Sequence, residues 1–439
     1  MNRCCSLIPL FVIAILGGCS QGPNGGTAAN ARPTKESEVI GEKIAVKQDV
    51  PPKTSSVPSL EIPREDGINH LSPAEVAEGW IKLFDGETLF GWKSNNQLGW
   101  SVQEGVITAD RRDAADEGLL VTTTRFAHYE LRADYRLEKG GNSGLFLRTP
   151  VTPTNPAVDC YELNMCDSKP NFATASLVGR ANPVKTVLGD GDWHTYHVRV
   201  EGDRIVVQFD GEQVLEYTDQ EPVPLKTGHI GLQMKGGKIE FRNLFLKPLG
   251  SQPLFDGQTL NGWHDVPGSQ SQFTVKEEAI QVLNGRGFLE TEMTAGNFVL
   301  QFDAITHGDK LNSGIFFRAM KGTEEAPSHG YEFQIHNGIK EGDRNRPEDH
   351  GTGAIFRRVS ARRVVSNDRE WLSATLIADG AHFSTWVNGI QMVDWTDERP
   401  ANDNPREGLR VAPGHLSLQG HDPTTDLAFR RLRLAETPE

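Results

Sequence analysis

The chain has 439 residues, a formal net charge of −14 and a pI of about 5.5. Such a length suits two domains or one large β-domain. The acidic balance argues against general electrostatic binding of nucleic acids or anionic membrane surfaces, and no apolar run of transmembrane length follows the first 20 residues.

The N-terminus has the parts of an export signal. Arg3 supplies positive charge, residues 7–16 are apolar, and two glycines precede Cys19. The ending "LGGC" is typical of bacterial lipoproteins, in which the cysteine carries the lipid. We therefore expect residues 1–19 to be a lipoprotein signal. Lipid on Cys19 would anchor the exported chain to a bacterial membrane, in the outer membrane or periplasm or at the cell surface. The alternative is an ordinary export signal.

The segment of residues 20–75 predicts a flexible tether. It is rich in Pro, Ser, Thr, Gly and charged residues and has no apolar periodicity, so it cannot bury a core. Near its end, "SPAEVAEGW" places Ser72 as N-cap, Pro73 at the first helical position and Glu75 at the third. This capping box predicts one short helix.

An internal repeat dominates the rest of the chain. "LFDGETLFGW" returns as "LFDGQTLNGW", "NSGLFLR" as "NSGIFFR" and "YELNMC" as "YEFQIH", and three further motifs follow in the same order. The period of about 170 to 190 residues is the size of a domain. The repeat predicts two homologous domains, at residues 76–249 and 250–436.

Both halves consist of short runs in which apolar and polar residues alternate, such as "FAHYELRADYRL" and "NFVLQFDAITH", separated by glycine turns. We predict an all-β protein made of two tandem β-sandwich domains of the jelly-roll type. Cys160 and Cys166 would lie about 20 Å apart on one extended strand, so we expect free thiols.

The combined order of LFDG-x-TL-x-GW, NSG-x-F-x-R, Y-E-x-Q, T-G-A and LQ-x-H resembles the 3-keto-disaccharide hydrolase family, whose members are concanavalin A-like jelly rolls. The resemblance covers both halves, and the second half looks particularly like secreted planctomycete members. It implies a hydrolase acting on carbohydrate. The E-x-D-x-x-E signature of laminarinase-type enzymes, which use paired carboxylates, is absent from the sequence.

The chemistry of such a hydrolase defines the groups that its site needs. A ketone at C3 of a sugar makes the C2 proton acidic, so a base removes it and the C1 substituent leaves by β-elimination. Water then adds across the double bond. The site needs a base near C2, a positive group at the enolate oxygen and an acid at the glycosidic oxygen.

Candidates for these roles stand in the second domain. Glu332 and His336 alternate along "YEFQIH" and would share one strand face, His421 follows "LSLQG", and Arg318 ends "NSGIFFR". We expect His336 or His421 as base, Glu332 as acid or metal ligand, and Arg318 at the enolate. A divalent metal ion held by Glu332, His336 and His421 is the one cofactor suggested.

The expected substrate-binding side chains are polar or aromatic residues near these groups and their counterparts in the first domain: Gln334, Gln419, Thr352, Trp386, Arg148 and Glu162. The structural alternative for Glu332 and Arg318 is an ion pair between strands, and for Gln334 a solvated sheet face. The basic run Arg357, Arg358, Arg362 and Arg363 indicates either a solvated loop or contact with an anionic sugar.

The first domain keeps Glu162 but has Cys166 at the position of His336, and Lys235 or Gly236 at that of His421. We expect this domain to bind or regulate rather than catalyse. Two other functions compete for the whole chain. One is a lectin-like carbohydrate-binding protein without turnover, which would use exposed tryptophans; the other is a cell-surface adhesion protein.

Overall fold

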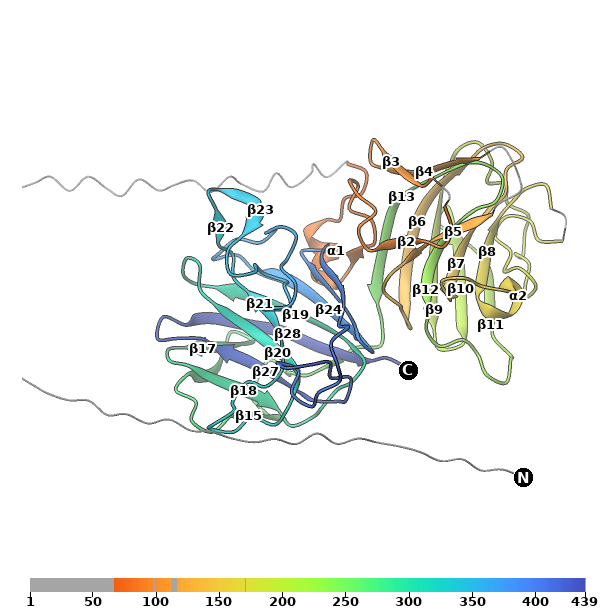
Figure 1. Ribbon diagram of the computed structural model, residues 1–439. Helices are drawn as coiled ribbons and strands as arrows, with labels where there is room; N and C mark the ends of the chain where they lie inside the picture. The colour runs from red at the N-terminus through yellow and green to blue at the C-terminus, as the bar shows by residue number, and fades with distance from the viewer. Residues whose placement is uncertain (1–66, 98, 112–116, 170, 439) are drawn as a thin grey trace, which may run out of the picture. The chain divides into compact units, whose positions relative to one another are not determined.

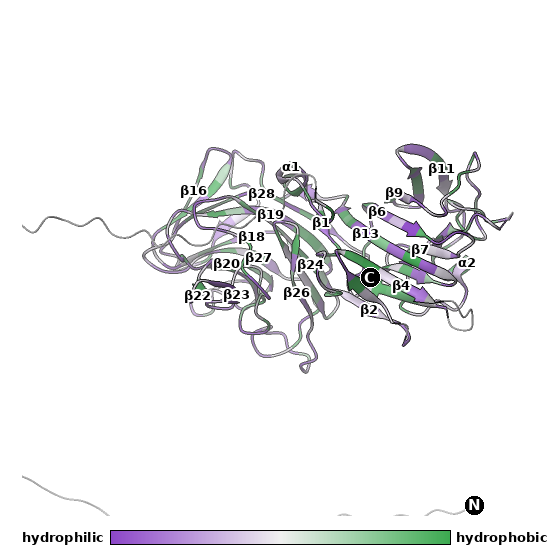
Figure 2. Ribbon diagram, turned by 90° about the horizontal axis from the view of Figure 1, so that it is seen from above, coloured by the Kyte–Doolittle hydropathy of each residue, from purple (hydrophilic) through white to green (hydrophobic). Residues whose placement is uncertain are grey.

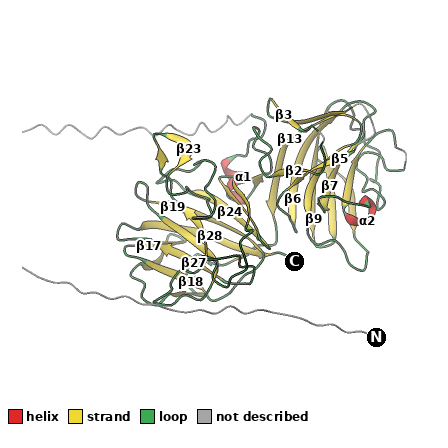
Figure 3. Ribbon diagram, in the orientation of Figure 1, coloured by secondary structure: helices red, strands yellow, loops and turns green. Residues whose placement is uncertain are grey.

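The computed structural model describes residues 67–97, 99–111, 117–169 and 171–438. Cys19 and most of the expected tether lie outside the described residues. The described part is nearly all β-structure, with two short helices, α1 (Pro73–Glu78) and α2 (Pro156–Asp159) (Figure 3). Neither is long and apolar enough to cross a membrane.

The first repeat forms an eight-stranded and a five-stranded antiparallel sheet (Figure 1). The larger sheet has the order β11-β10-β9-β6-β13-β4-β3, with β1 paired to β13. Its strands are β1 (Ile81–Lys82), β3 (Ser101–Gln103), β4 (Val106–Arg111), β6 (Tyr129–Leu137), β9 (Trp193–Glu201), β10 (Arg204–Phe209), β11 (Glu212–Thr218) and β13 (Gly237–Pro248). The smaller sheet runs in the order β2 (Trp92–Ser94), β5 (Gly118–Thr122), β12 (His229–Met234), β7 (Ser143–Thr149) and β8 (Tyr161–Met165).

The second repeat builds the same pair of sheets. The eight-stranded sheet has the order β16-β17-β28-β19-β24-β25-β26, with β14 paired to β28. Its strands are β14 (Gln252–Pro253), β16 (Gln272–Lys276), β17 (Ala279–Leu283), β19 (Phe298–Thr306), β24 (Leu372–Asp379), β25 (His382–Val387), β26 (Ile390–Thr396) and β28 (Asp426–Glu436). The five-stranded sheet runs β15 (Trp263–Asp265), β18 (Gly287–Thr291), β27 (His415–Gly420), β20 (Ser313–Ala319) and β21 (Tyr331–Ile335). A separate hairpin of β22 (Ile339–Lys340) and β23 (Asp343–Pro347) follows β21.

Alternation of apolar and polar residues explains the sandwiches. Along β6 every second residue is fully buried and faces the core between the two sheets, where it meets side chains of the smaller sheet such as Leu145 and Leu163. Figure 2 shows strands such as β13 banded between hydrophilic and hydrophobic residues. Two tandem β-sandwiches are therefore confirmed, and Cys160 and Cys166 are buried free thiols.

The repeated "LFDG…GW" motif closes a loop in the same way in both domains. Asp85 and Asp256 each accept hydrogen bonds from the backbone N–H groups two and three residues later, which makes a tight turn. The indole N–H of Trp92 donates to the carbonyl of Leu83, and that of Trp263 donates to Leu254. The repeated residues of this motif therefore stabilise a turn and a loop.

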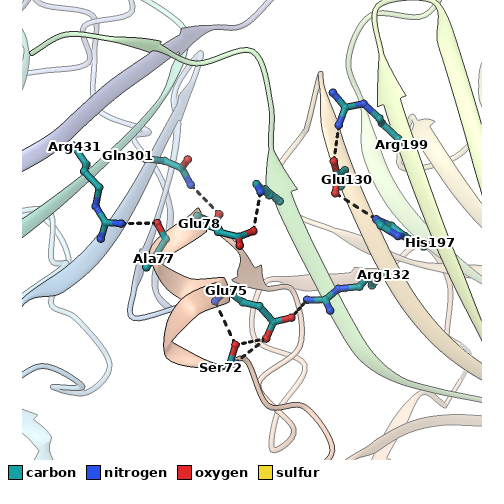
Figure 4. Close-up of polar contacts among 12 residues, drawn as sticks. Ser72, Glu75, Ala77, Glu78, Glu130, Arg132, His197, Arg199, Gln301 and Arg431 are labelled. Carbon is teal, nitrogen blue, oxygen red and sulfur yellow. Dashed lines mark hydrogen bonds and ion pairs between the residues drawn. The ribbon is translucent and has the colours of Figure 1, made fainter. Parts of the chain in front are cut away.

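The predicted helix is present with its predicted cap. The Ser72 hydroxyl accepts from the Glu75 N–H, and the Glu75 carboxylate accepts from the Ser72 N–H. Figure 4 shows that side chains from strands of both repeats form hydrogen bonds and ion pairs with this helix. Glu75 pairs with Arg132 of the first, and the Ala77 carbonyl accepts from Arg431 of the second.

Candidate functional site

The polar side chains of β21 lie on the outer face of the five-stranded sheet. Tyr331, Phe333 and Ile335 point into the core, so Glu332 and Gln334 must point away from it. They are nevertheless buried: Glu332 is only 4% exposed and Gln334 is inaccessible. The solvated sheet face considered for Gln334 is therefore wrong, because loops cover this part of the sheet.

Glu332 has the most unusual setting on this face. Its Oε2 atom lies 3.1 Å from Nη2 of Arg406, which itself lies over the ring of Phe316. Burial raises the pKa of Glu332 to about 7, although Arg406 and His421 act in the opposite direction. A carboxyl group with that pKa can both give and take a proton near neutral pH, as a general acid–base catalyst must.

His421 stands just beyond the end of β27, close enough to Glu332 for its charge to lower the glutamate's pKa. Its Nδ1 atom lies 2.9 Å from a carboxylate oxygen of Asp422, and its side chain is 43% exposed. Because a carboxylate only accepts, Nδ1 carries the hydrogen and Nε2 is left as a proton acceptor. Asp422 thus fixes the orientation of the His421 ring.

Two glutamines line the face beside Glu332. Gln334 donates from Nε2 to a carboxylate oxygen of Asp349 at 3.0 Å, and Gln419 lies on β27 in line with His421. The Oε1 atoms of both are buried and have no partner among the described residues. Unpaired buried amide oxygens are costly unless a ligand hydroxyl donates to them.

His336 lies apart from this group. It follows Glu332 by four residues, roughly 13 Å along the strand. Its nearest charged neighbour is Glu348, with 3.9 Å between Nε2 and Oε2. Thr352 accepts from the His336 N–H and donates to Asn337, so it fastens the loop to the strand end.

The expected metal site is not assembled. Within the described ranges, no three His, Cys, Asp or Glu side chains stand close enough together to hold a metal ion. Glu332 and His421 share the face, but His336 is directed toward Glu348 instead. The expectation that Glu332, His336 and His421 together hold a metal ion is therefore wrong.

The interpretation of Arg318 as the positive group is also wrong. Its guanidinium is completely buried and donates to the carbonyls of Gly296, Gly380 and Arg410. The strand register shifts between Phe316 and Ala319, and Arg318 has φ of 46°. This bulge breaks the alternation that predicted an outward side chain, and it also rules out the ion pair with Glu332.

Arg148 repeats this arrangement in the first domain. It too has a positive φ at a register shift and donates to backbone carbonyls, those of Ala127, Gly202 and Leu225. Neither arginine reaches the outer face. Both are structural, so the expected substrate contact by Arg148 is wrong for the same reason.

The expected substrate contact by Trp386 is also wrong, because this side chain is not accessible. It is 1% exposed and donates from its indole to the Lys82 carbonyl. Trp193 and Trp371 occupy equivalent positions, each with an arginine of the last strand of its domain stacked 3.9 Å from the ring centroid. These tryptophans contribute packing and cation–π contacts.

The first domain keeps the buried glutamate of this site but not its histidine. Glu162 is buried on the equivalent face, and burial raises its pKa. The registers that pair Met234 with Gly118 and Gly420 with Gly287 identify Lys235, not Gly236, as the counterpart of His421. Lys235 pairs with Glu117 instead of an aspartate.

Arg406, Asp349 and Asp422 were missed from the sequence. Arg406 and Asp349 lie in loops that are longer in the second repeat than in the first: residues 397–414 against 219–228, and 337–351 against 167–173. That difference in loop length was the available signal. For Asp422 the signal was its place directly after His421, where its carboxylate can reach the imidazole.

The four arginines of the basic run have different partners. Arg362 pairs with Asp85 at 2.7 Å and Arg363 with Glu87 at 2.8 Å, both in the first domain. Arg358 donates to the carbonyl of Arg406 and so supports that loop. Only Arg357 is left on the outside, with its guanidinium over the ring of Phe356.

Comparisons with known proteins agree with this organisation. A family model described as a 3-keto-alpha-glucoside-1,2-lyase-like domain matches twice, at residues 79–247 and 250–435. A 3-keto-disaccharide hydrolase of Bacteroides thetaiotaomicron is 25% identical over 292 residues, which cover 54% of this chain and 94% of that protein.

Similar solved structures include a protein from Parabacteroides distasonis that is proposed to be a glycosyl hydrolase. It has a TM-score of 0.37 and 21% identity, and the match covers 42% of this chain and 100% of that one. A carbohydrate-binding module from Bacillus subtilis has a TM-score of 0.29 and 15% identity over 36% of this chain and 95% of its own.

Proposed function

Because the chain belongs to the 3-keto-α-glucoside-1,2-lyase-like family, with two copies of its domain, we propose that the second copy hydrolyses 3-keto-glycosides. The observation that carries the proposal is the buried Glu332, held beside Arg406 with a pKa of about 7. Such a carboxyl group suits proton transfer to a glycosidic oxygen at neutral pH.

The proposed reaction begins with His421, oriented by Asp422. Its Nε2 atom takes the C2 proton, and the electrons of the C2–H bond move onto the C3 ketone to give an enolate. Arg406 stabilises the negative oxygen. The enolate then expels the C1 substituent as its C1–O bond breaks, and protonated Glu332 supplies the hydrogen of the departing alcohol.

Addition of water reverses these proton movements. The Glu332 carboxylate takes a proton from water as the hydroxyl group bonds to C1, and protonated His421 returns a proton to C2. Both residues regain their starting states, and the products are a 3-keto sugar and an alcohol. Gln334 and Gln419 accept hydrogen bonds from sugar hydroxyls in this proposal, since their amide oxygens have no partner among the described residues.

The first domain is proposed to bind carbohydrate without turnover. It keeps the buried Glu162 but carries Lys235 in place of His421 and has a short loop where Arg406 stands in the second domain. A lectin-like function for the whole chain depended on exposed tryptophans such as Trp386 and Trp371. Trp386 is buried, and Trp371, which is 37% exposed, has Arg430 stacked over its ring. No observation favours this second candidate over catalysis.

Export and anchoring remain part of the proposal. The "LGGC" sequence supports lipid attachment at Cys19 after removal of residues 1–18. Expression in a bacterium fed a labelled fatty acid tests it. Label should enter the wild-type protein and be absent from Cys19→Ser; equal labelling of both would refute the attachment site.

The catalytic proposal is tested with the full chain, 3-keto disaccharides and their unoxidised parents, with and without a chelator. Glu332→Gln should lower kcat/KM for the keto sugars by about 10²–10⁴-fold, since a general acid is lost. Glu162→Gln is the matched control and should retain activity. Turnover by Glu332→Gln at the wild-type rate, or loss only in Glu162→Gln, would contradict the proposal.

A further inference from the structure

Two further arginines lie close to Arg406, the partner of Glu332, although the chain as a whole is strongly acidic. Arg406 contacts the glutamate directly. Arg357 follows Phe356, whose N–H donates to the Glu332 carbonyl at 2.9 Å. Arg286 directly precedes Gly287, which pairs with Gly420, so it lies opposite His421 across the strands. Burial lowers the pKa of Arg406, and the charges of Arg357 and Arg286 lower it further, which agrees with their being close.

Arg286 and Arg357 differ from most arginines of this protein in having no carboxylate partner among the described residues. Both are exposed. By contrast, nearby Arg399 is held by Asp397, and Arg362 and Arg363 by Asp85 and Glu87. Two unpaired guanidinium groups beside a third repel one another unless an anion lies between them.

The first domain shows that these arginines are not required by the fold. The residue that precedes the equivalent glycine there is Glu117, and the matching bridges Leu177–Ala181 and Ile355–Val359 make Gly179 the counterpart of Arg357. Gly179 has φ of 74° and Arg357 has φ of 58°, so both occupy the left-handed region. Glycine adopts this conformation freely, whereas an arginine is strained there. The second domain thus carries a charged side chain where a glycine suits the backbone better.

We propose that Arg286 and Arg357 bind an anionic group on the saccharide that occupies the Glu332 face, so that the preferred substrate carries a carboxylate, sulfate or phosphate substituent. This inference rests on the proposed function for the location of the sugar, but not for its turnover. Guanidinium groups bind all three oxyanions through paired N–H donors. The net charge of −14 repels anions at long range, so local arginines are needed to hold one.

Binding by the full chain is measured by calorimetry with four probes: methyl glucoside, methyl glucuronide, methyl glucoside 6-sulfate and methyl glucoside 6-phosphate. At least one anionic probe should bind about tenfold or more tightly than methyl glucoside, because charge-assisted hydrogen bonds are gained. The preference should weaken as salt is added. The best of the three anions identifies the substituent. Equal affinity for all four probes, or no binding of any anion, overturns the inference.

The double variant Arg286→Gln/Arg357→Gln should lose this preference while its affinity for methyl glucoside is unchanged. Arg199→Gln/Arg204→Gln removes the same charge from the exposed surface of the first domain and should behave as wild type. Anion binding that survives in the first double variant refutes the assignment. Binding that follows the expected pattern in a chain that cleaves no keto sugar would uphold this inference and refute the hydrolase proposal.

Discussion

Glu332 folds over Gly314 on the neighbouring strand. A methyl group at position 314 would lie 3.0 Å from both Cγ and Oε1 of Glu332, and 2.9 Å from the carbonyl oxygen of Phe333. Both domains repeat the pairing, since Gly144 lies under Glu162 with a slightly longer contact of 3.2 Å. The glycine of the "NSG" motif therefore makes room for the glutamate of "YE".

Gly314→Ala should displace the Glu332 carboxylate and abolish most activity. The substitution also presses on backbone, so some loss of stability accompanies it, on the order of 1–3 kcal/mol. Gly144→Ala, with only side-chain atoms closest, should cost less and leave activity intact. Activity assays and thermal unfolding of both variants check this. An active Gly314→Ala enzyme would show that the position of Glu332 does not matter.

Because of Glu332, the free energy of unfolding should decrease as the pH rises. Its pKa rises from 4.5 to about 7 in the folded state. Below pH 4.5 the carboxyl is protonated in both states and has no effect. Between these values the unfolded chain loses the proton first, so the free energy of unfolding falls by about 3 kcal/mol and then levels off above pH 7.

Glu332→Gln, a neutral isostere, should therefore gain stability relative to wild type between about pH 4 and about pH 8. Denaturant unfolding at the two pH values gives the difference. Exposed Glu278→Gln is the control and should show no such gain. A constant difference between Glu332→Gln and wild type across this range would mean that the folded protein holds Glu332 ionised throughout.

Removal of the imidazole of His421 should lower kcat/KM for keto sugars by about 10²–10⁴-fold, since the base is lost. Asp422→Asn should cost less, because it only disturbs the orientation of the ring and its proton. Steady-state assays with keto sugars measure both variants. His336→Ala is the comparison: if it, and not His421→Ala, removes turnover, His336 is the base.

Arg318→Met and Arg148→Met should destabilise the protein to a similar extent, by about 3 kcal/mol or more, since each leaves several buried carbonyls without a donor. Arg204→Met, at an exposed ion pair, should change little. Thermal or denaturant unfolding measures all three. A fully stable but inactive Arg318→Met protein would return Arg318 to the catalytic residues.

The sequence by itself determined the repeat, the all-β class and the capped helix, because these depend on local patterns. Alternation also placed Glu332 and Gln334 correctly on one strand face. The same rule failed at Arg318, where a bulge shifts the register and turns the side chain inward. A single extra residue in a strand is not visible in a period-two pattern.

Only the tertiary structure decided which groups meet Glu332 and how strongly it is buried. Arg406 and Asp349 come from long loops, and loop residues have no periodicity from which a partner can be inferred. The pKa of Glu332 depends on the atoms that exclude water from it, which are contributed by distant segments. In the same way, the fold joined Arg362 and Arg363 to acidic partners and left Arg357 without one among the described residues, although all three belong to one basic run.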